Sequence, residues 1–251
     1  MTARTEPPEG LLLAAGLGTR LRSGPRGGYK PLTRIAGVSL VERAVRGLEL
    51  AGCRRILVVV GHGADAVRAE LDGRGTRAPG TVLQFVDNPR HDLGNGVSVL
   101  AARPHITAGR LILAMADHVV GEDVMLRAGR HTPEPDGATL LVDRKIASVF
   151  DLNDATRVWS EGDRVVQIGK GLRPFNAVDT GVFVTTPALF EPLDVLRRTN
   201  GDASLTEGVQ ALADAGRMEA LDIGAGFWQD VDTPAMLAHA EHEVRLRERC
   251  R

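Results

Sequence analysis

The chain has few aromatic residues and almost no excess of charge of either sign. Phe, Trp and Tyr make up only 4% of its 251 residues, which argues against the aromatic stacking platforms that bind single-stranded nucleic acids. With 31 Lys and Arg against 32 Asp and Glu, the formal net charge is −1. The chain therefore lacks the strong positive charge that would predict binding to nucleic acid or to a membrane surface.

Cysteines and long apolar runs are also scarce. Cys53 and Cys250 have neither the spacing of metal ligands nor that of a disulfide framework, which is typical of a reducing compartment. No stretch approaches the ~20 apolar residues of a membrane span, and the run after the polar start is too short for a secretory signal. We therefore expect a soluble, cytoplasmic protein that does not insert into the membrane.

Short apolar runs alternate with amphipathic segments in the first part of the chain. They predict strands over residues 11–15, 55–60, 81–86, 111–116 and 138–142. Residues 39–52 place apolar side chains on one face at helical spacing, and Ser39 can cap that helix. Residues 64–73 predict a shorter helix that ends at Gly73. Strand, helix and strand in this order favour right-handed crossovers and a parallel sheet.

The pattern changes after about residue 143. Residues 157–169 read as two strands around a Gly-Asp turn, and residues 176–186 read as another strand. Helices are expected over 187–198, 204–215 and 233–249, the last with Thr233 as its cap and Pro234 in its first turn. We predict one α/β domain with a Rossmann-like, mixed and mostly parallel sheet flanked by helices. Residues 10–142 would form its nucleotide-binding half and residues 143–251 its acceptor-binding half.

The segment LLLAAGLGTRLR, residues 11–22, ends a predicted strand in a glycine-rich turn. A dinucleotide site needs a third glycine where Leu21 stands, and an acidic residue after the next strand, which instead ends VVVGH. No Gly-Lys-Ser/Thr sequence follows, so the P-loop motif fails as well. The remaining interpretation is a phosphate-binding turn, with Arg20 and Lys30 neutralising a polyphosphate. A surface loop with solvated charges is the alternative.

Aspartates follow two further segments. Asp117 comes after the predicted strand 111–116, where open α/β sheets bind their ligands, and WQDVDT supplies Asp230 and Asp232. Two carboxylates that meet across a fold suit Mg²⁺. Either could instead serve a loop or a helix, and Asp232 directly precedes the expected cap Thr233. Asp230 is therefore the preferred metal partner of Asp117.

Residues 11–45 resemble the opening signature of the nucleotidyltransferases that activate sugar phosphates. The resemblance rests on the glycine loop, the Lys30-Pro31-Leu32 segment and the helix entry IAGVSLVERAV, although GGYK stands where many members have Pro-Lys. Further along, MADHVV, DLNDATRV, QIGK, NAVDTGVF and WQDVDTPAML resemble the CTP-dependent branch, the inositol-1-phosphate cytidylyltransferases. Members of that branch are often fused to a membrane synthase, so a separate downstream transferase is an expected partner.

The resemblance implies a role for each matching residue. Residues expected to hold CTP are Leu13, Ala14, Ala15, Gly16, Gly18, Thr19, Arg20 and Lys30, with Gly94 and Asn95 near the base and ribose. Mg²⁺ is expected on Asp117 and Asp230. Residues expected to meet the acceptor are Lys170 at its phosphate, and Asp143, Asn176 and Asp179 at its hydroxyls.

The implied reaction is transfer of CMP from CTP to inositol-1-phosphate or a similar polyol phosphate, with release of pyrophosphate. Two alternatives keep the enzyme class: a small phosphonate as acceptor, or another nucleoside triphosphate acting on a sugar-1-phosphate. A third is a non-catalytic nucleotide-binding module, which would be expected to have lost Lys30 or a metal carboxylate. The sequence predicts no oligomeric state.

Overall fold

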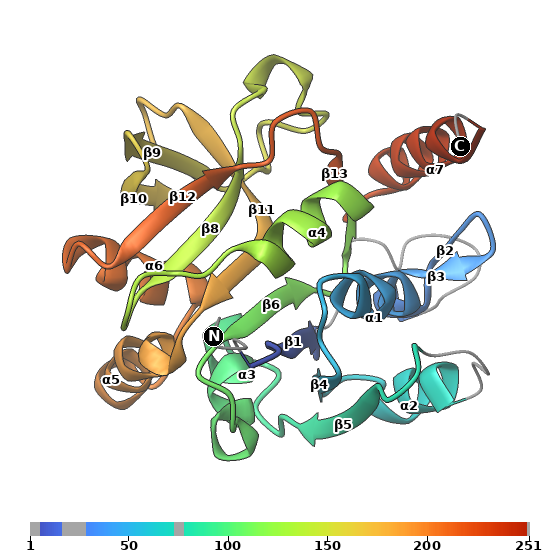
Figure 1. Ribbon diagram of the computed structural model, residues 1–251, viewed down its shortest axis with the longest axis horizontal. Coiled ribbons are helices and arrows are strands. Elements are labelled where there is room, and N and C mark those ends of the chain that lie inside the picture. The colour runs from blue at the N-terminus through green and yellow to red at the C-terminus, as the bar shows by residue number, and fades with distance from the viewer. Residues whose placement is uncertain (1–5, 17–28, 73–77, 250–251) are drawn as a thin grey trace, which may run out of the picture.

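The computed structural model describes residues 6–16, 29–72 and 78–249, and it folds them around one large sheet (Figure 1). In this described part the sheet has nine strands in the order β5-β4-β1-β6-β11-β8-β12-β10-β9. Their bounds are β1 (Glu9–Ala14), β4 (Arg55–Val60), β5 (Val82–Asp87), β6 (Leu111–Met115), β8 (Ala138–Asp143), β9 (Arg157–Glu161), β10 (Arg164–Gly169), β11 (Ala177–Thr185) and β12 (Met218–Asp222).

The sheet is mixed, and most of its strands run the same way. β5, β4, β1 and β6 pair in parallel, and so do β8 and β12. β11 lies antiparallel between β6 and β8, and β10 is antiparallel to both β12 and β9. Only these two of the nine strands oppose the rest, which confirms the predicted mixed, mostly parallel Rossmann-like sheet.

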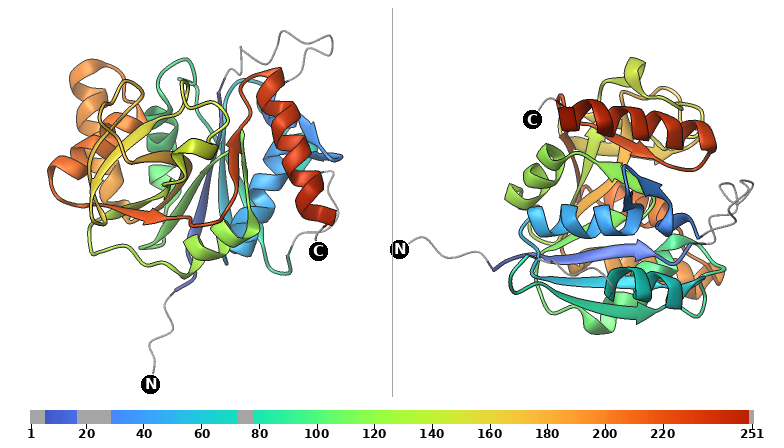
Figure 2. Two further views of the ribbon diagram at one scale, coloured as in Figure 1. Left: turned by 90° about the horizontal axis from the view of Figure 1, so that it is seen from above. Right: turned by 90° about the vertical axis from the view of Figure 1, so that its right-hand side faces the viewer.

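Helices cover both faces of the sheet, as the two views in Figure 2 show. They are α1 (Leu40–Leu50), α2 (Ala64–Asp72), α3 (Asn95–Ala102), α4 (Glu122–Arg130), α5 (Phe190–Asn200), α6 (Leu205–Asp214) and α7 (Pro234–Arg249). Short 3₁₀ helices span Lys30–Leu32, Arg103–His105, Ile146–Ser148 and Pro187–Leu189. Two small ribbons complete the fold: β2 (Arg34–Ile35) with β3 (Val38–Ser39), and β7 (His118–Val120) with β13 (Trp228–Asp230).

The central strand β1 supplies both apolar cores. Successive side chains of a strand point to opposite faces. Leu11 and Leu13 accordingly pack in the core under α3, α5 and α6, whereas Leu12 and Ala14 pack in the core under α1, α2 and α4. Each fully buried leucine contributes about 1.5–3 kcal/mol through the hydrophobic effect. A third cluster, which includes Val119 and Val231, joins the β7–β13 ribbon to α7.

The local predictions differ in how well they match. The strand predicted over residues 55–60 is β4 itself, and the other four predicted strands of the first part lie within two residues of the observed ones. Thr233 accepts from the Met236 amide at 3.2 Å, as expected of a cap. The prediction for Ser39 is wrong: it occupies the N-cap position of α1 without a capping bond, and its buried hydroxyl has no partner. Gly73 lies outside the described residues.

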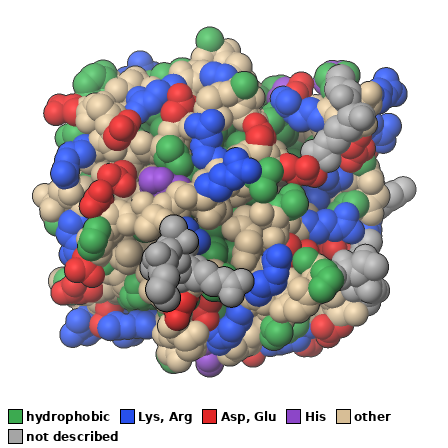
Figure 3. Space-filling model, in the orientation of Figure 1, with side chains coloured by type: hydrophobic (Ala, Val, Ile, Leu, Met, Phe, Trp, Pro, Cys, Tyr) green, Lys and Arg blue, Asp and Glu red, His purple; other side chains and the backbone are tan. Residues whose placement is uncertain are grey.

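The surface carries both signs of charge. On the face shown in Figure 3, acidic and basic side chains are interspersed, which matches the nearly neutral composition. Among the described helices, none combines the length and the apolar character that a membrane crossing requires.

Candidate active site

Three distant segments meet at the carboxyl ends of β1 and β6. The amide of Ala116, just after β6, donates to the Leu13 carbonyl of β1 at 3.0 Å. The amide of Val231, just after β13, donates to the Asp117 carbonyl at 3.0 Å. The β7–β13 ribbon then pairs His118 with Asp230 and Trp228 with Val120. Because residues two apart on a strand share a face, His118, Trp228 and Asp230 lie on the same side of this ribbon.

Lys30 links two of these segments. Its side chain is 8% exposed, and its ammonium donates to Asp117 Oδ2 at 2.6 Å and to Asp232 Oδ1. Burial alone would lower the pKa of Lys30, but the two carboxylate charges outweigh it and raise the pKa above its usual range. The lysine therefore remains a cation over the whole neutral pH range. It binds two aspartates that lie 87 and 202 positions further along the sequence.

Asp117 is held ionised by two neighbouring groups. Its Oδ2 accepts from Lys30, and its Oδ1 accepts from His118 Nδ1 at 2.7 Å. Burial acts to raise the pKa of Asp117, but the charges and hydrogen bonds of His118 and Lys30 hold it well below its usual range. Conversely, burial acts to lower the pKa of His118, and the charge of Asp117 raises it. The three groups form one charged network.

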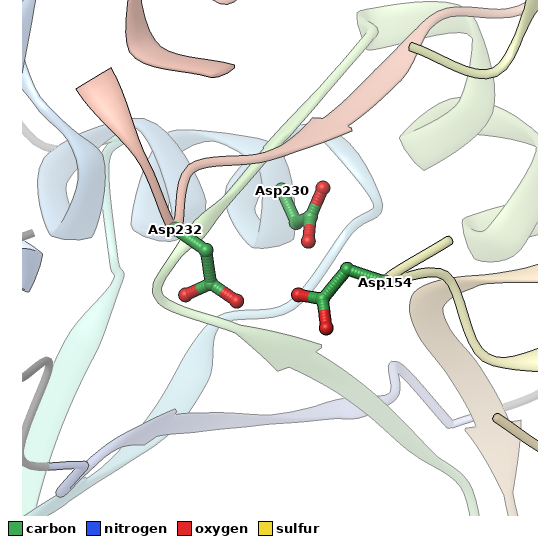
Figure 4. Close-up of side chains that lie close together, drawn as sticks. All are labelled: Asp154, Asp230 and Asp232. Atoms are coloured by element: carbon green, nitrogen blue, oxygen red, sulfur yellow. The ribbon is translucent and has the colours of Figure 1, made fainter. Parts of the chain in front are cut away.

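A cluster of three carboxylates lies next to this network. Figure 4 shows the side chains of Asp154, Asp230 and Asp232 pointing toward one another, and an oxygen from each lies within 4.8 Å of the other two. Burial raises the pKa of Asp230, and so do the nearby Asp232 and Asp117, against the opposing effect of His118. Oxygen ligands at this density are the chemistry that Mg²⁺ uses in proteins. The magnesium ligands Asp117 and Asp230 stay a prediction, and the geometry adds Asp232 and Asp154.

A cavity of about 160 Å³ opens beside the carboxylates. Among the residues that line it are Asn95, Lys170, Asp179 and Asp230, all of them predicted site residues. The Lys170 ammonium donates to Asp154 at 2.6 Å, and its side chain is 58% exposed. Burial raises the pKa of Asp179 to about 6, although its carboxylate accepts from the Gly181 amide. Among its described lining residues, the cavity thus combines acceptor oxygens with the accessible ammonium of Lys170.

Gly181 shapes the wall of this cavity between Asp179 and His118. Its φ is +75°, a left-handed conformation that side chains other than glycine rarely adopt, and a Cβ there would lie 2.8 Å from the His118 ring. The register of β11 shifts at this point between Asp179 and Phe183. A glycine here lets the bulged strand pass directly under the imidazole.

Some predicted site residues lie elsewhere. Neither Asp143 nor Asn176 lines the 160 Å³ cavity: the Asn176 amide is bonded to Ser160, and the Asp143 carboxylate to Lys145 and Trp228. Gly94 packs against the backbone of Ala203, because a Cβ at position 94 would lie 2.5 Å from the Ala203 carbonyl oxygen.

The remaining predicted nucleotide contacts lie at or beyond the end of β1. Leu13, Ala14 and Ala15 are buried there, and Gly16 is exposed. The predicted contacts Gly18, Thr19 and Arg20 lie outside the described residues.

Four residues of the site were not among the predicted ones: His118, Asp154, Trp228 and Asp232. Each lies in a segment that the resemblance had already singled out, namely MADHVV, DLNDATRV or WQDVDTPAML. Asp232 was interpreted as charge for the last helix, whereas its carboxylate binds Lys30. Asp154 had no signal of its own, because it lies in an irregular stretch between η4 (Ile146–Ser148) and β9.

Residues 10–149 match the sequence profile of the MobA-like NTP transferase domain. The chain belongs to this family. It is 36% identical, over 96% of its length, to the bifunctional IPC transferase and DIPP synthase of Rubrobacter xylanophilus, and 32% identical over 93% to the protein of that name in Thermococcus kodakarensis. It spans about half of these relatives, 53% and 50% of their lengths.

Solved structures agree with this assignment. The inositol-1-phosphate CTP transferase from T. maritima has a TM-score of 0.80 and 25% identity, covering 94% of this chain and 96% of that one. A UDP-glucose pyrophosphorylase has a TM-score of 0.78 at 17% identity, over 96% and 99% of the two chains, and shows the fold alone. The predicted nucleotidyltransferase fold and enzyme class are therefore confirmed.

Proposed function

We propose that this chain transfers CMP from CTP to inositol-1-phosphate and releases pyrophosphate, with Mg²⁺ as its cofactor. The observation that carries the proposal is a pair of ion pairs, from Lys30 to Asp117 and to Asp232. They lie beside the cavity that Asp179 and Lys170 line. The relatives named IPC transferase and the T. maritima inositol-1-phosphate CTP transferase support the choice of nucleotide and acceptor. A cytoplasmic location completes the proposal, supported by the scarcity of cysteine.

The residues present fit a divalent cation. Asp230 and Asp232 project from one segment, Asp154 approaches from another, and the raised pKa of Asp230 reflects its burial first and then the nearby negative charges of Asp232 and Asp117. We assign the ion to Asp117 and Asp230, with Asp232 within reach. Bound Mg²⁺ would supply positive charge that stabilises the phosphates of CTP.

The reaction asks the protein for positioning and charge stabilisation. A phosphate acceptor is already an anion near neutral pH, so its oxygen can attack the α-phosphorus of CTP in line without a strong base. Lys30 and Arg20 neutralise the leaving pyrophosphate, and Lys170 orients the acceptor's phosphate. No covalent intermediate is required, because both substrates are bound side by side.

The walls of the cavity favour a polyol over a small phosphonate. Carboxylates accept hydrogen bonds and donate none when ionised, and Asp154 and Asp179 both line the cavity. A ring with several hydroxyls can donate to both, and its phosphate can meet Lys170. A small phosphonate without hydroxyls would add no donor to these carboxylates beyond the Lys170 ammonium on Asp154 and the Gly181 amide on Asp179.

A pyrophosphate-release screen tests the proposal. It would cross CTP, UTP, dTTP and ATP with inositol-1-phosphate, several sugar-1-phosphates and small phosphonates, each with and without Mg²⁺. We expect turnover with CTP and inositol-1-phosphate that EDTA abolishes. Turnover with CTP only when a phosphonate is the acceptor would refute inositol-1-phosphate as the acceptor and leave cytidylyl transfer as the reaction. Turnover only with another triphosphate would refute CTP as the nucleotide substrate.

Ligand binding separates the enzyme from a non-catalytic nucleotide-binding module. A ligand that binds only the folded state raises its stability by about 2.7 kcal/mol at 100 times its dissociation constant. We expect CTP with Mg²⁺ to raise the melting temperature and NAD to leave it unchanged. A shift with CTP in the absence of any turnover across the screen would favour the non-catalytic module.

A further inference from the structure

Trp228 stands between two cavities. One is the 160 Å³ cavity of the candidate active site, and the other is a cavity of about 310 Å³ on the far side, bounded by Asp143, Phe150, His239 and Arg247. Trp228 lines both. Its ring stacks on His118 with centroids 6.0 Å apart and planes 18° from parallel. The indole therefore contacts the site network with its face and the second cavity with its edge.

The ribbon that carries Trp228 is short. β7 and β13 share only three residue pairs, with Trp228 opposite Val120 and Asp230 opposite His118. A two-stranded ribbon is marginally stable by itself, so side-chain packing has to fix it. Trp228 and His118 are diagonal neighbours on one face of this ribbon, within reach of an aromatic ring. The stacking contact is thus placed to hold the imidazole that binds Asp117.

Asp143 fixes the other end of the indole. It is the last residue of β8 and is 4% exposed. Its Oδ2 accepts from Trp228 Nε1 at 3.0 Å, and its Oδ1 accepts from the amide and the ammonium of Lys145 at 2.7 and 2.8 Å. Three donors occupy a buried carboxylate that lines the second cavity rather than the first. The described contacts of Asp143 therefore lead to Trp228 and Lys145 and not into the first cavity.

We propose that Asp143 and Trp228 are positioning residues: Asp143 orients the indole, and the indole holds His118 and, through it, the carboxylate of Asp117. The inference rests on the proposed function, because only there does Asp117 act as a metal ligand. It replaces the expected contact of Asp143 with acceptor hydroxyls by an action through Trp228. Asp143, which does not line the cavity proposed for the acceptor, then influences the rate of the chemical step and not the affinity for the acceptor.

Two substitutions of the tryptophan separate its contacts. Trp228→Phe keeps a ring against His118 and loses the bond to Asp143, whereas Trp228→Leu loses both. Misplacing a reacting group by about 1 Å costs on the order of 10²-fold in rate. We therefore expect kcat to fall about 10²-fold in Trp228→Leu and about tenfold in Trp228→Phe. The other tryptophan, in Trp159→Phe, is the matched control and should leave kcat unchanged.

A double-mutant cycle tests the order of action. If Asp143 acts only through the indole, Asp143→Asn should lower kcat about tenfold in the wild-type background and have no further effect in Trp228→Phe. Additive losses in the double variant would overturn the proposal. A tenfold rise in KM for inositol-1-phosphate caused by Asp143→Asn in either background would also overturn it, in favour of an acceptor contact.

An NMR measurement tests whether Trp228 and Asp143 position His118, and it does not depend on turnover. The indole face shifts the ring-proton resonances of His118, which His118→Gln identifies in NMR spectra of uniformly labelled protein. We expect these resonances to move in Trp228→Leu and in Asp143→Asn, at unchanged circular dichroism, and to stay in place in Trp159→Phe. Unmoved His118 resonances in the first two variants would refute positioning. If the wild type lacks CTP-dependent turnover, the proposed function fails while this measurement still judges the inference.

Discussion

Replacing Lys30 with methionine removes a buried cation and leaves two carboxylates facing each other. Methionine keeps most of the length and volume of the side chain, so packing changes little. The charge balance changes strongly, because Asp117 and Asp232 both bind the same ammonium. His118 still faces Asp117 and partly compensates its charge. We expect the variant to be folded but markedly less stable.

The expected loss follows from the burial of the three groups. Removing one partner of a fully buried ion pair costs about 3–5 kcal/mol. The side chains of Lys30, Asp117 and Asp232 are 8%, 30% and 15% exposed, so water screens the carboxylates in part and the lower end applies. We predict a loss of about 2–3 kcal/mol in the free energy of unfolding. For a chain of this size that lowers the melting temperature by roughly 4–12 °C.

The loss should depend on pH. The lowered pKa of Asp117 in the folded state means that its contribution is fully present above the unfolded pKa of about 3.9, and disappears only in stronger acid. The raised pKa of Lys30 keeps its contribution present up to about pH 10. The ion pair of Lys30 and Asp117 in the wild type is therefore intact from about pH 5 to 9. In Lys30→Met, protonation of the Asp117 and Asp232 carboxylates relieves their repulsion, so the deficit should shrink by about 1 kcal/mol between pH 7.5 and pH 4.5.

Urea denaturation followed by circular dichroism measures the effect at both pH values. Lys170→Met is the matched control, because Lys170 is 58% exposed in its pair with Asp154 and an exposed pair contributes only about 0–1 kcal/mol. Lys30→Met with Asp232→Asn removes one repelling charge and should recover part of the stability. Wild-type stability in Lys30→Met at pH 7.5, or a deficit that is the same at pH 4.5, would refute the reasoning.

Three further predictions concern the same site. Asp117→Asn should lower kcat about 10²–10³-fold in the pyrophosphate assay with a native circular dichroism spectrum, and near-normal turnover would exclude Asp117 as a metal ligand. Gly181→Ala should lose about 1–3 kcal/mol in urea denaturation, because of its positive φ and the His118 ring 2.8 Å from the added Cβ; an unchanged midpoint would contradict this. Burial raises the pKa of Asp179 to about 6, so its ionised form destabilises the fold at higher pH. The melting temperature of Asp179→Asn should therefore exceed that of the wild type by more at pH 8 than at pH 5, and an equal difference at both would count against it.

The strands of the first part of the sheet could be predicted because they carry their own signal. RILVVV in β4 is a continuous apolar run, as expected of a strand buried on both faces, and its predicted and observed bounds coincide. The β7–β13 ribbon had no such signal. Its strands have three residues each, and their pairing joins positions 112 apart, as in His118 with Asp230. Only the completed fold brings them together.

The same limit applies to single side chains. Ser39 before α1 and Asp232 before α7 both match local rules for helix starts, yet Ser39 makes no capping bond and Asp232 binds Lys30. Ser39 is the buried last residue of β3. Local sequence allows both outcomes, and tertiary packing decides between them. Asp117 was predictable because the carboxyl end of a strand is itself a location of ligand sites.

Lys30 shows why fold and site cannot be separated by single substitutions here. Its ammonium joins Asp117, at the end of β6, to Asp232, at the start of α7. A Lys30 variant with low activity would therefore be explained equally by lost charge at the phosphates or by lost order of the two aspartates. The combination Lys30→Met with Asp232→Asn distinguishes these explanations, because it restores charge balance without restoring the cation. If the lysine only orders the site, turnover should recover together with stability to the level of Asp232→Asn alone, whereas if it acts on the nucleotide, stability should recover and turnover should stay below that level.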